Sequence, residues 1–342
     1  MNMIEKIVNY ARTHDLSDLH IHPGEPFAIR VHGVIQTFPD DFIESETIEA
    51  FVKEITNDEQ MDHYQRQKDL DMAIAHEDLR FRVNVYNTSN GPAVVMRKIE
   101  TVIPDAGTLG LPDVILNVAN ERNGLVLVTG PTGSGKSTTL AALIDRINQE
   151  RHENIITVED PIEFVHQSKS CLVSQREVGR DAISFSSALK AMLREDPDVI
   201  LVGEMRDLET ISLALTAAET GHLVFGTLHT NGAPNSINRI LDVFPPQQQA
   251  QARSQLSQSL RLVVTQQLLK RSDGPGRAAA FEIMVNNPAI ANLIRENKVF
   301  QITQAMQTGK ALGMITMEES VRQLVAQGVV NEDTDADGIH AA

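Results

Sequence analysis

The sequence predicts an α/β protein of two domains, in which a small α+β unit precedes a larger unit built around a parallel sheet. Its 342 residues exceed what one hydrophobic core usually supports. Turn residues punctuate the first 100 residues or so, and from residue 123 onward short apolar runs alternate with helical patterns. These three observations favour two domains, each with a core of its own.

The first domain, residues 1–100, is expected to contain two helices and three strands. The helices are predicted around Ile4–Thr13 and near Thr47–Ile55, and the strands at Ala28–Val31, near Leu79–Tyr86 and near Ala93–Ile99. The last two strands flank a segment rich in turn formers, residues 88–92, so an antiparallel hairpin is the natural interpretation. Strand alternation places Arg80 and Arg82 on one face of that hairpin.

A connecting segment, residues 101–113, is predicted to follow. It contains two prolines and two glycines with few charges, which is typical of an ordered connection rather than a flexible spacer. The second domain is therefore placed at residues 114–330. Residues 331–342 are acidic and small, and we expect that tail to be disordered.

Buried parallel strands are predicted at four apolar runs of the second domain, Leu125–Val128, Ile155–Val158, Val199–Val202 and Leu223–Phe225. Between the first two runs, apolar residues recur at helical spacing and predict an amphipathic crossover helix over residues 140–147. Beyond Phe244 the pattern is interpreted as helical, with apolar stripes through Leu256–Leu269, Ile290–Ile294 and Met317–Val325.

Composition excludes several classes of function. The chain has 46 Asp and Glu against 30 Lys and Arg, a formal charge of -16 that disfavours nucleic acid as a partner. Its single cysteine, Cys171, allows neither an internal disulfide nor a four-thiolate zinc site, and suits a reducing cytoplasm. No apolar run is long enough to cross a bilayer, so any membrane contact is expected to be peripheral.

The strongest chemical signal is a loop that satisfies G-x-x-x-x-G-K-[ST] between an apolar strand and a helix. Its glycines let backbone N–H groups surround phosphates, its lysine reaches the β and γ oxygens of ATP, and its serine ligates Mg²⁺. With the threonine that follows, the predicted nucleotide-binding set is Gly130, Pro131, Thr132, Gly133, Ser134, Gly135, Lys136, Ser137 and Thr138.

Polar clusters follow the next three apolar strands directly. They are residues 159–163, Gly203-Glu204 and residues 226–229. Ligands bind at the carboxyl ends of strands in open α/β sheets, so all three clusters are expected to converge on one γ-phosphate. A carboxylate there can activate water, another can hold the water shell of the metal, and an imidazole can sense the phosphate.

Together these segments resemble the type IV pilus and type II secretion ATPase superfamily, most closely the pilus retraction ATPases of the PilT type. The matching segments cover nearly the whole chain: Ser17–His20, the P-loop, the acidic box Thr157–Glu163, the Walker B region from Arg194 to Asp207, and a histidine box from Thr220 to His229. The resemblance implies a PAS-like N-terminal domain, a RecA-like ATPase domain with a helical C-terminal part, a homohexameric ring, and a platform protein of the pilus at the cytoplasmic face of the inner membrane.

The resemblance also implies roles for single residues. Glu163 becomes the expected catalytic base, and Glu204 the Walker B acid that holds Mg²⁺ through water. The family histidines His222 and His229 are assigned to the nucleotide. Two arginines of the predicted N-terminal strands, Arg82 and Arg97, correspond to residues that supply positive charge to bound nucleotide in this family, although ordinary surface charge explains them equally well.

Two positions depart from the retraction pattern. The family segment at residues 289–296 usually carries an arginine third, where this chain has Ala291, and the family hairpin often carries one at its turn, where this chain has residues 88–91. A secretion or pilus-assembly motor therefore stays open as an alternative. A DNA translocase fits the acidic charge poorly, and a non-hydrolysing scaffold is disfavoured because Lys136, Glu163 and Glu204 are all present. One cysteine and a P-loop that begins at Gly130 match the short retraction enzymes, because assembly and secretion ATPases of the superfamily typically add an N-terminal domain and a zinc-binding insertion.

Overall fold

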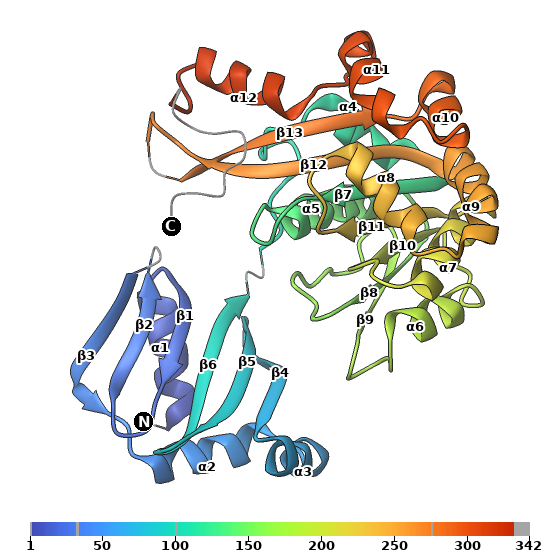
Figure 1. Cartoon of the computed structure of the whole chain (residues 1–342). Coiled ribbons are helices and arrows are strands. Elements are labelled where there is room, and N and C mark those ends of the chain that lie inside the picture. The colour runs from blue at the N-terminus through green and yellow to red at the C-terminus, as the bar shows by residue number, and fades with distance from the viewer. Residues whose placement is uncertain (1, 32–33, 100–101, 275, 332–342) are drawn as a thin grey trace. The chain divides into compact units, whose positions relative to one another are not determined.

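The structure is a computed structural model that describes residues 2–31, 34–99, 102–274 and 276–331. These residues form two compact units, one up to Val102 and the other from Ile103 onward (Figure 1). The expected disorder of the acidic tail concerns residues that, apart from Asn331, lie outside the described part of the chain. No helix in the described part combines the length and the apolar character that a membrane crossing requires.

The N-terminal unit is a six-stranded antiparallel sheet in the order β3-β2-β1-β6-β5-β4, with three helices. Its elements are α1 (Met3–Thr13), β1 (Leu16–Ile21), β2 (Pro26–Val31), β3 (Val34–Phe42), α2 (Ser45–Ile55), α3 (Asp58–Gln67), β4 (Asp69–His76), β5 (Leu79–Thr88) and β6 (Gly91–Ile99). The two predicted helices, the three predicted strands and the β5–β6 hairpin are confirmed.

Four elements of this unit, β1, β3, α3 and β4, were not predicted from the sequence. Two of them, α3 and β3, show the reason. Helix α3 buries none of its residues, so its sequence carries no apolar stripe; the capping box of Asn57 and Gln60 marks its start instead. Strand β3 is an edge strand that contains Pro39 and two aspartates and is exposed along most of its length. An alternating apolar pattern is absent from both segments.

One face of the N-terminal sheet is apolar and the other carries charge. Leu19, Phe81 and Val83 belong to the apolar core together with residues of α1 and α2. Strand alternation turns the intervening side chains to the opposite face, where the strand register places Arg82 directly across from Arg97. The unit therefore presents the two predicted arginines side by side.

The second unit is a seven-stranded sheet in the order β13-β12-β7-β11-β10-β8-β9, in which only the β12–β13 pair is antiparallel. Its strands are β7 (Gly124–Thr129), β8 (Asn154–Glu159), β9 (Leu172–Glu177), β10 (Val199–Val202), β11 (Leu223–Leu228), β12 (Leu260–Lys270) and β13 (Arg277–Val285). All residues of β7, β10 and β11 are buried, and so is the predicted run Ile155–Val158 within β8, so the prediction of strands covered on both faces is confirmed for all four runs.

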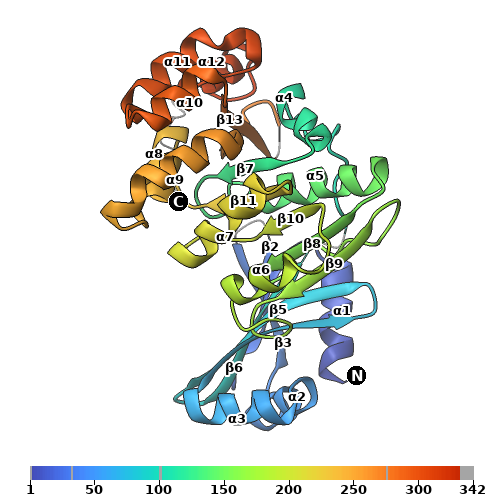
Figure 2. The ribbon, with the colours of Figure 1, turned by 90° about the vertical axis from the view of Figure 1, so that its right-hand side faces the viewer.

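Helices cover both faces of this sheet. Successive residues of β7 point to different cores: Val126 and Val128 pack with α5, whereas Leu125 and Leu127 pack with α6, α7 and α8. Figures 1 and 2 show α10, α11 and α12 gathered at one end of the unit, beside the β12–β13 edge. The helices are α4 (Asp113–Leu116), α5 (Lys136–Glu150), α6 (Phe185–Met192), α7 (Leu208–Glu219), α8 (Ala233–Asp242), α9 (Pro246–Ser259), α10 (Pro288–Arg295), α11 (Ile302–Thr308) and α12 (Met317–Ala326), with short 3₁₀ turns at Asn117–Asn120, Val299–Gln301 and Lys310–Leu312.

The prediction of a helical stripe through Leu256–Leu269 is wrong beyond Ser259, where α9 ends and the strand β12 begins. A long apolar run fits a buried helix and a buried strand equally well, and here the β-branched Val263, Val264 and Thr265 pair in parallel with β7. The helices predicted at Ile290–Ile294 and Met317–Val325 are confirmed. The C-terminal part of the chain is thus a β-hairpin followed by helices.

Candidate active site

The P-loop turns sharply between β7 and α5 because three of its glycines adopt positive φ. The values are +137° at Gly130, +77° at Gly133 and +89° at Gly135. A Cβ atom at Gly130 would lie 2.4 Å from the backbone oxygen of Gln266, so this position accepts only glycine without a shift of β12. The loop then enters α5 at Lys136, which places the positive end of the helix at the loop.

Lys136 is buried, and its ammonium is held inside the loop. Its Nζ donates hydrogen bonds of 2.9 Å to the backbone oxygens of Gly130 and of Pro131. Burial lowers the pKa of Lys136, while the charges of Glu163 and Glu204 act in the opposite direction. The structure therefore brings both predicted carboxylates into the electrostatic environment of the P-loop lysine.

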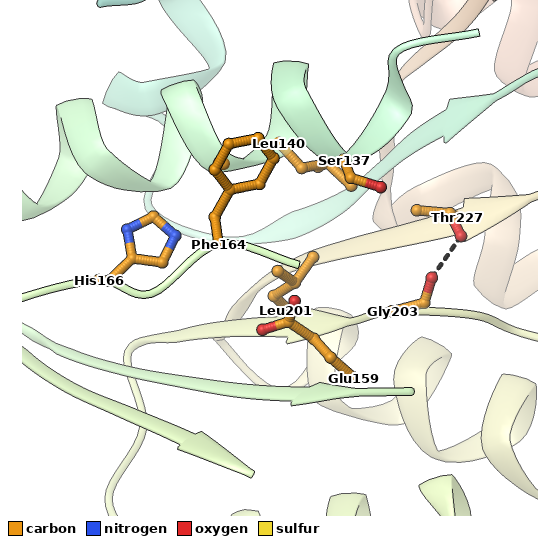
Figure 3. A pocket seen from close by; sticks show the side chains of 9 residues that line it. Ser137, Leu140, Glu159, Phe164, His166, Leu201, Gly203 and Thr227 are labelled. Carbon is orange, nitrogen blue, oxygen red and sulfur yellow. Dashed lines mark hydrogen bonds between the residues drawn. The ribbon is translucent and has the colours of Figure 1, made fainter. Parts of the chain in front are cut away.

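A cavity of about 40 Å³ lies beside the start of α5 (Figure 3). Ser137 enters it from α5, Glu159 from the end of β8, Gly203 from the end of β10, and Thr227 from β11. Thr227 donates a hydrogen bond to the backbone oxygen of Gly203. All three predicted clusters thus contribute to the cavity, since Thr227 belongs to the cluster at residues 226–229. The remaining lining residues are Leu140, Ala141, Phe164, His166 and Leu201.

Glu204 contacts two neighbouring side chains, a histidine and an arginine. Its Oε1 lies 3.3 Å from Nε2 of His229, the residue that follows β11, and it also forms an ion pair with Arg206. Only 18% of the Glu204 side chain is exposed. A histidine bonded to this carboxylate at the strand ends is well placed to respond to a phosphate bound there.

Glu159 differs from the other carboxylates of the site. Burial raises its pKa, although hydrogen bonds from Thr157 and Gln175 and from the backbone of Glu163 oppose that effect. The charge of Glu163 raises the pKa of Glu159 further. Glu159 thus borders the cavity as a carboxyl that holds its proton more strongly than usual.

Asn148 fixes the chain that follows Glu163. This fully buried residue of α5 donates to the backbone oxygen of Gln167 at 2.7 Å and accepts from the backbone N–H of Lys169 at 3.0 Å. Lys169 also pairs with Asp145 of the same helix at 2.7 Å. The segment that carries Glu163 is therefore attached to the P-loop helix.

His222 does not lie with these residues. It precedes β11, whereas the P-loop and His229 lie at the carboxyl ends of the strands. The two histidines are seven positions apart along the chain, or roughly 23 Å at the usual rise of a strand. The Nδ1 of His222 lies 2.9 Å from the backbone oxygen of Ala217, at the end of α7. Within one chain, the site contains one of the two predicted histidines.

The two predicted arginines lie on the N-terminal unit and are paired with carboxylates there. Arg97 donates from Nε to Asp18 at 2.9 Å, and Arg82 bonds Asp71 through Nε at 3.1 Å. Although burial raises the pKa of Asp18, the hydrogen bonds from Ser17 and Arg97 outweigh it and lower the pKa. The side chain of Arg97 is nevertheless 69% exposed, so its guanidinium remains accessible.

Gln266 and Thr265 of β12 are site residues that the sequence interpretation missed. The amide oxygen of Gln266 accepts from Thr139 of α5 at 2.8 Å, and its amide nitrogen lies where a side chain at Gly135 would be. Thr265 shares a 2.8 Å hydroxyl bond with Thr129, the residue before the P-loop. The sequence did carry a signal for these residues, because they are polar positions inside an apolar run, but the run was interpreted as a helix.

The single cysteine, Cys171, is buried, and so are Met306 and Met314, whereas Met317 is partly buried. The described residues hold no group of three or more His, Cys, Asp or Glu side chains arranged to bind a metal.

Residues 1–335 match the family model described as "Type II/IV secretion system protein". The chain belongs to this family. It is 49% identical to the type IV pilus retraction ATPase PilT of Pseudomonas aeruginosa over 331 residues, which is 96% of each chain. It is also 52% identical to a twitching motility protein of Neisseria gonorrhoeae, covering 88% of this chain and 81% of the other.

A solved structure gives the same result for the fold. The crystal structure of the pilus retraction motor PilT with bound ADP matches with a TM-score of 0.92 and 43% identity, covering 100% of this chain and 97% of the other. The structure of the ATPase DotB from Legionella pneumophila matches at 28% identity with a TM-score of 0.82. Both the family and its mixed α/β architecture are therefore shown.

Proposed function

We propose that this chain is an ATP-hydrolysing motor subunit that powers the retraction of type IV pili. The proposal rests mainly on the 49% identity to a pilus retraction ATPase, which extends over 96% of both chains. The P-loop is also intact, and the charges of Glu163 and Glu204 act on its lysine. The reaction is the transfer of the γ-phosphoryl group of ATP to water.

Binding of ATP begins at the loop. The backbone N–H groups from Gly130 to Thr138 surround the phosphates, and the positive end of α5 adds to the attraction. Lys136 exchanges its bonds to the loop carbonyls for bonds to the β and γ oxygens. Because the lysine is already buried and oriented, little side-chain freedom is lost on binding.

Hydrolysis requires a base and a way to detect the γ-phosphate. Glu163 accepts the proton of the attacking water. The carboxyl group of the neighbouring Glu159 instead accepts hydrogen bonds from Thr157 and Gln175. His229 bonds Glu204 at 3.3 Å and reports the presence of the γ-phosphate to it. His222, at the opposite strand end, acts outside this set of residues.

The residues present also suit Mg²⁺. The hydroxyl of Ser137 and the carboxylate of Glu204 would hold the ion, because both offer oxygen ligands of the kind that it prefers. When bound, the ion neutralises the charge that develops on the β and γ oxygens.

The larger assembly follows from the family. Residues 1–100 form a PAS-like domain, 101–113 a linker and 114–330 a RecA-like ATPase domain, and six copies assemble into a ring. Arg82 and Arg97 add positive charge to bound nucleotide, which arginine suits because it stays ionised. The ring acts in the cytoplasm against a platform protein at the inner membrane, with no nucleic-acid partner and only peripheral contact with lipid.

Ala291 favours a second candidate function, a pilus-assembly or secretion motor. This residue of α10 stands where retraction enzymes of the family usually carry arginine. The chain is also 32% identical to the type II secretion protein HxcR, over 75% of that protein. The lower identity and coverage make this the weaker reading.

Two experiments test the proposal. With purified protein, Lys136→Ala should abolish ATP hydrolysis, while Glu163→Gln should bind ATP without turning it over, because only the base is lost. In cells, a clean deletion should abolish twitching and leave normal or excess surface pili by electron microscopy. Bald cells would assign the motor to assembly, and wild-type protein that hydrolyses no ATP would refute both candidates.

A further inference from the structure

One side chain of the neighbouring strand β9 holds the segment that carries Glu163 in place through hydrogen bonds. Gln175 lies on β9, directly across from Thr157 of β8 in the parallel register. Its Nε2 donates to the backbone oxygen of Phe164 at 2.8 Å and to Oε1 of Glu159 at 3.1 Å. Its Oε1 accepts from the backbone N–H of His166 at 2.7 Å.

These three partners fix the orientation of the carboxamide. The backbone oxygen of Phe164 can only accept and the backbone N–H of His166 can only donate, so exchanging the amide oxygen and nitrogen would break both bonds. A flexible side chain is thus held in one conformation. Its contacts lie on both sides of Glu163, one before it at Glu159 and two after it.

The same contacts define part of the cavity. Glu159, Phe164 and His166 all line it together with Ser137. Figure 3 shows the side chains of these residues around the space beside α5. A shift of the segment that carries Glu163 would therefore move Glu163 and the cavity wall together relative to the P-loop.

We propose that Gln175 is a positioning residue for hydrolysis, which fixes both the Glu163 segment and the Glu159 carboxyl relative to the nucleotide. It does not touch the nucleotide. This inference rests on the proposed function, because it assumes that Glu163 is the base. The neighbouring Glu177 supports the same segment before Glu163, by accepting from the backbone N–H of Ile162 at 3.1 Å.

The first test is Gln175→Met, which keeps the length of the side chain and removes all three hydrogen bonds. We expect kcat to fall about tenfold to a hundredfold, because misplacing a reacting group by about 1 Å has an effect of that size. KM and the affinity for ADP should stay within about threefold of wild type, since the P-loop is not altered. Gln258→Met, at an exposed position of α9, is the matched control and should leave kcat unchanged.

The second test, Gln175→Glu, has a pH signature that a merely structural role lacks. When ionised, the new carboxylate keeps the bond from His166 but can donate to neither Glu159 nor the backbone oxygen of Phe164. When it takes up a proton, one donor is restored. The deficit in kcat relative to wild type should therefore shrink as the pH is lowered from 8 to 6. This variant decides the question if Gln175→Met does not fold.

Five results separate the possible failures. A Gln175→Met enzyme with kcat within about twofold of wild type overturns the inference, as does a parallel loss of ADP affinity. A pH-independent deficit in Gln175→Glu also overturns it. If Glu163→Gln keeps normal turnover, the assignment of the base fails and this inference fails with it, whereas inactive Glu163→Gln beside active Gln175→Met refutes the role of Gln175 alone.

Discussion

Replacing Gly130 by alanine should be far more damaging than the same change at Gly133, although both glycines lie in the P-loop with positive φ. At Gly130, φ is +137° and the new Cβ would lie 2.4 Å from the backbone oxygen of Gln266 and 2.8 Å from Oγ of Ser134. At Gly133, φ is +77° and no atom lies within 4 Å of the new Cβ. The pair thus separates steric exclusion from backbone strain.

The expected magnitudes follow from these contacts. Gly133→Ala introduces a left-handed alanine, which costs about 1–2 kcal/mol, partly offset by the reduced entropy of the unfolded chain. Gly130→Ala introduces backbone strain of about 1–3 kcal/mol. It also introduces overpacking of similar size, because the new Cβ meets the backbone oxygen of Gln266 in β12, which cannot rotate away. We expect Gly130→Ala to be less stable than Gly133→Ala by roughly 2–4 kcal/mol.

Denaturant unfolding of both variants without nucleotide measures the difference directly, and titration with a fluorescent ADP analogue measures binding. Gly130→Ala should also weaken ADP binding more than Gly133→Ala, since relief of the clash must displace either the loop or β12. If the two variants unfold within about 0.5 kcal/mol of each other, the close approach of β12 to the P-loop does not exist as described and the reasoning is refuted.

Three further predictions concern other parts of the chain. Arg97→Ala should lower ATP turnover far more than it changes the mass of the ring by light scattering; unchanged turnover would leave Arg97 as surface charge. Burial lowers the pKa of His166 to about 4 from 6.5, so the unfolded chain takes up this proton at a higher pH than the folded chain does. The free energy of unfolding therefore falls as the pH drops from 6.5 to about 4. His166→Gln should remove up to about 3 kcal/mol of this fall, measured by unfolding at pH 7 and 4.5. Asn148→Ala should destabilise the ATPase unit by about 2–4 kcal/mol because two backbone groups lose their buried partner, and an effect below 1 kcal/mol would contradict that account.

Much of the site could be predicted because its chemistry depends on residues close in sequence. The P-loop is one continuous segment, and the strand runs before Glu163, Glu204 and His229 are strongly apolar. Each run therefore marks a buried strand and the polar residue at its carboxyl end. The same rule could have excluded His222, which precedes its strand instead of following it.

The supporting residues could not be predicted, because their partners are distant in sequence. Gln175 is identified only by its contacts with the segment after β8, and Asn148 only by its contacts with residues 167 and 169. In the sequence both are ordinary amides, one on a strand and the other near the end of a helix. Strand β9 itself buries few of its residues fully, so it carries little apolar signal.

The error over β12 has the most consequence, because this strand completes the environment of the P-loop. Buried Thr265 and Gln266 interrupt its apolar run, and in a helix such residues would mark a solvent-exposed face. Here they bond instead to Thr129 and Thr139, on either side of the loop. In the next strand Glu282, across from Thr265 in the register, accepts from the backbone N–H of Ala233 at 2.7 Å, at the start of α8. The polar residues of the β12–β13 hairpin therefore support both the nucleotide site and the helix that follows His229. Because their hydrogen bonds join three separate segments of the chain, these roles cannot be deduced from the periodicity of one segment.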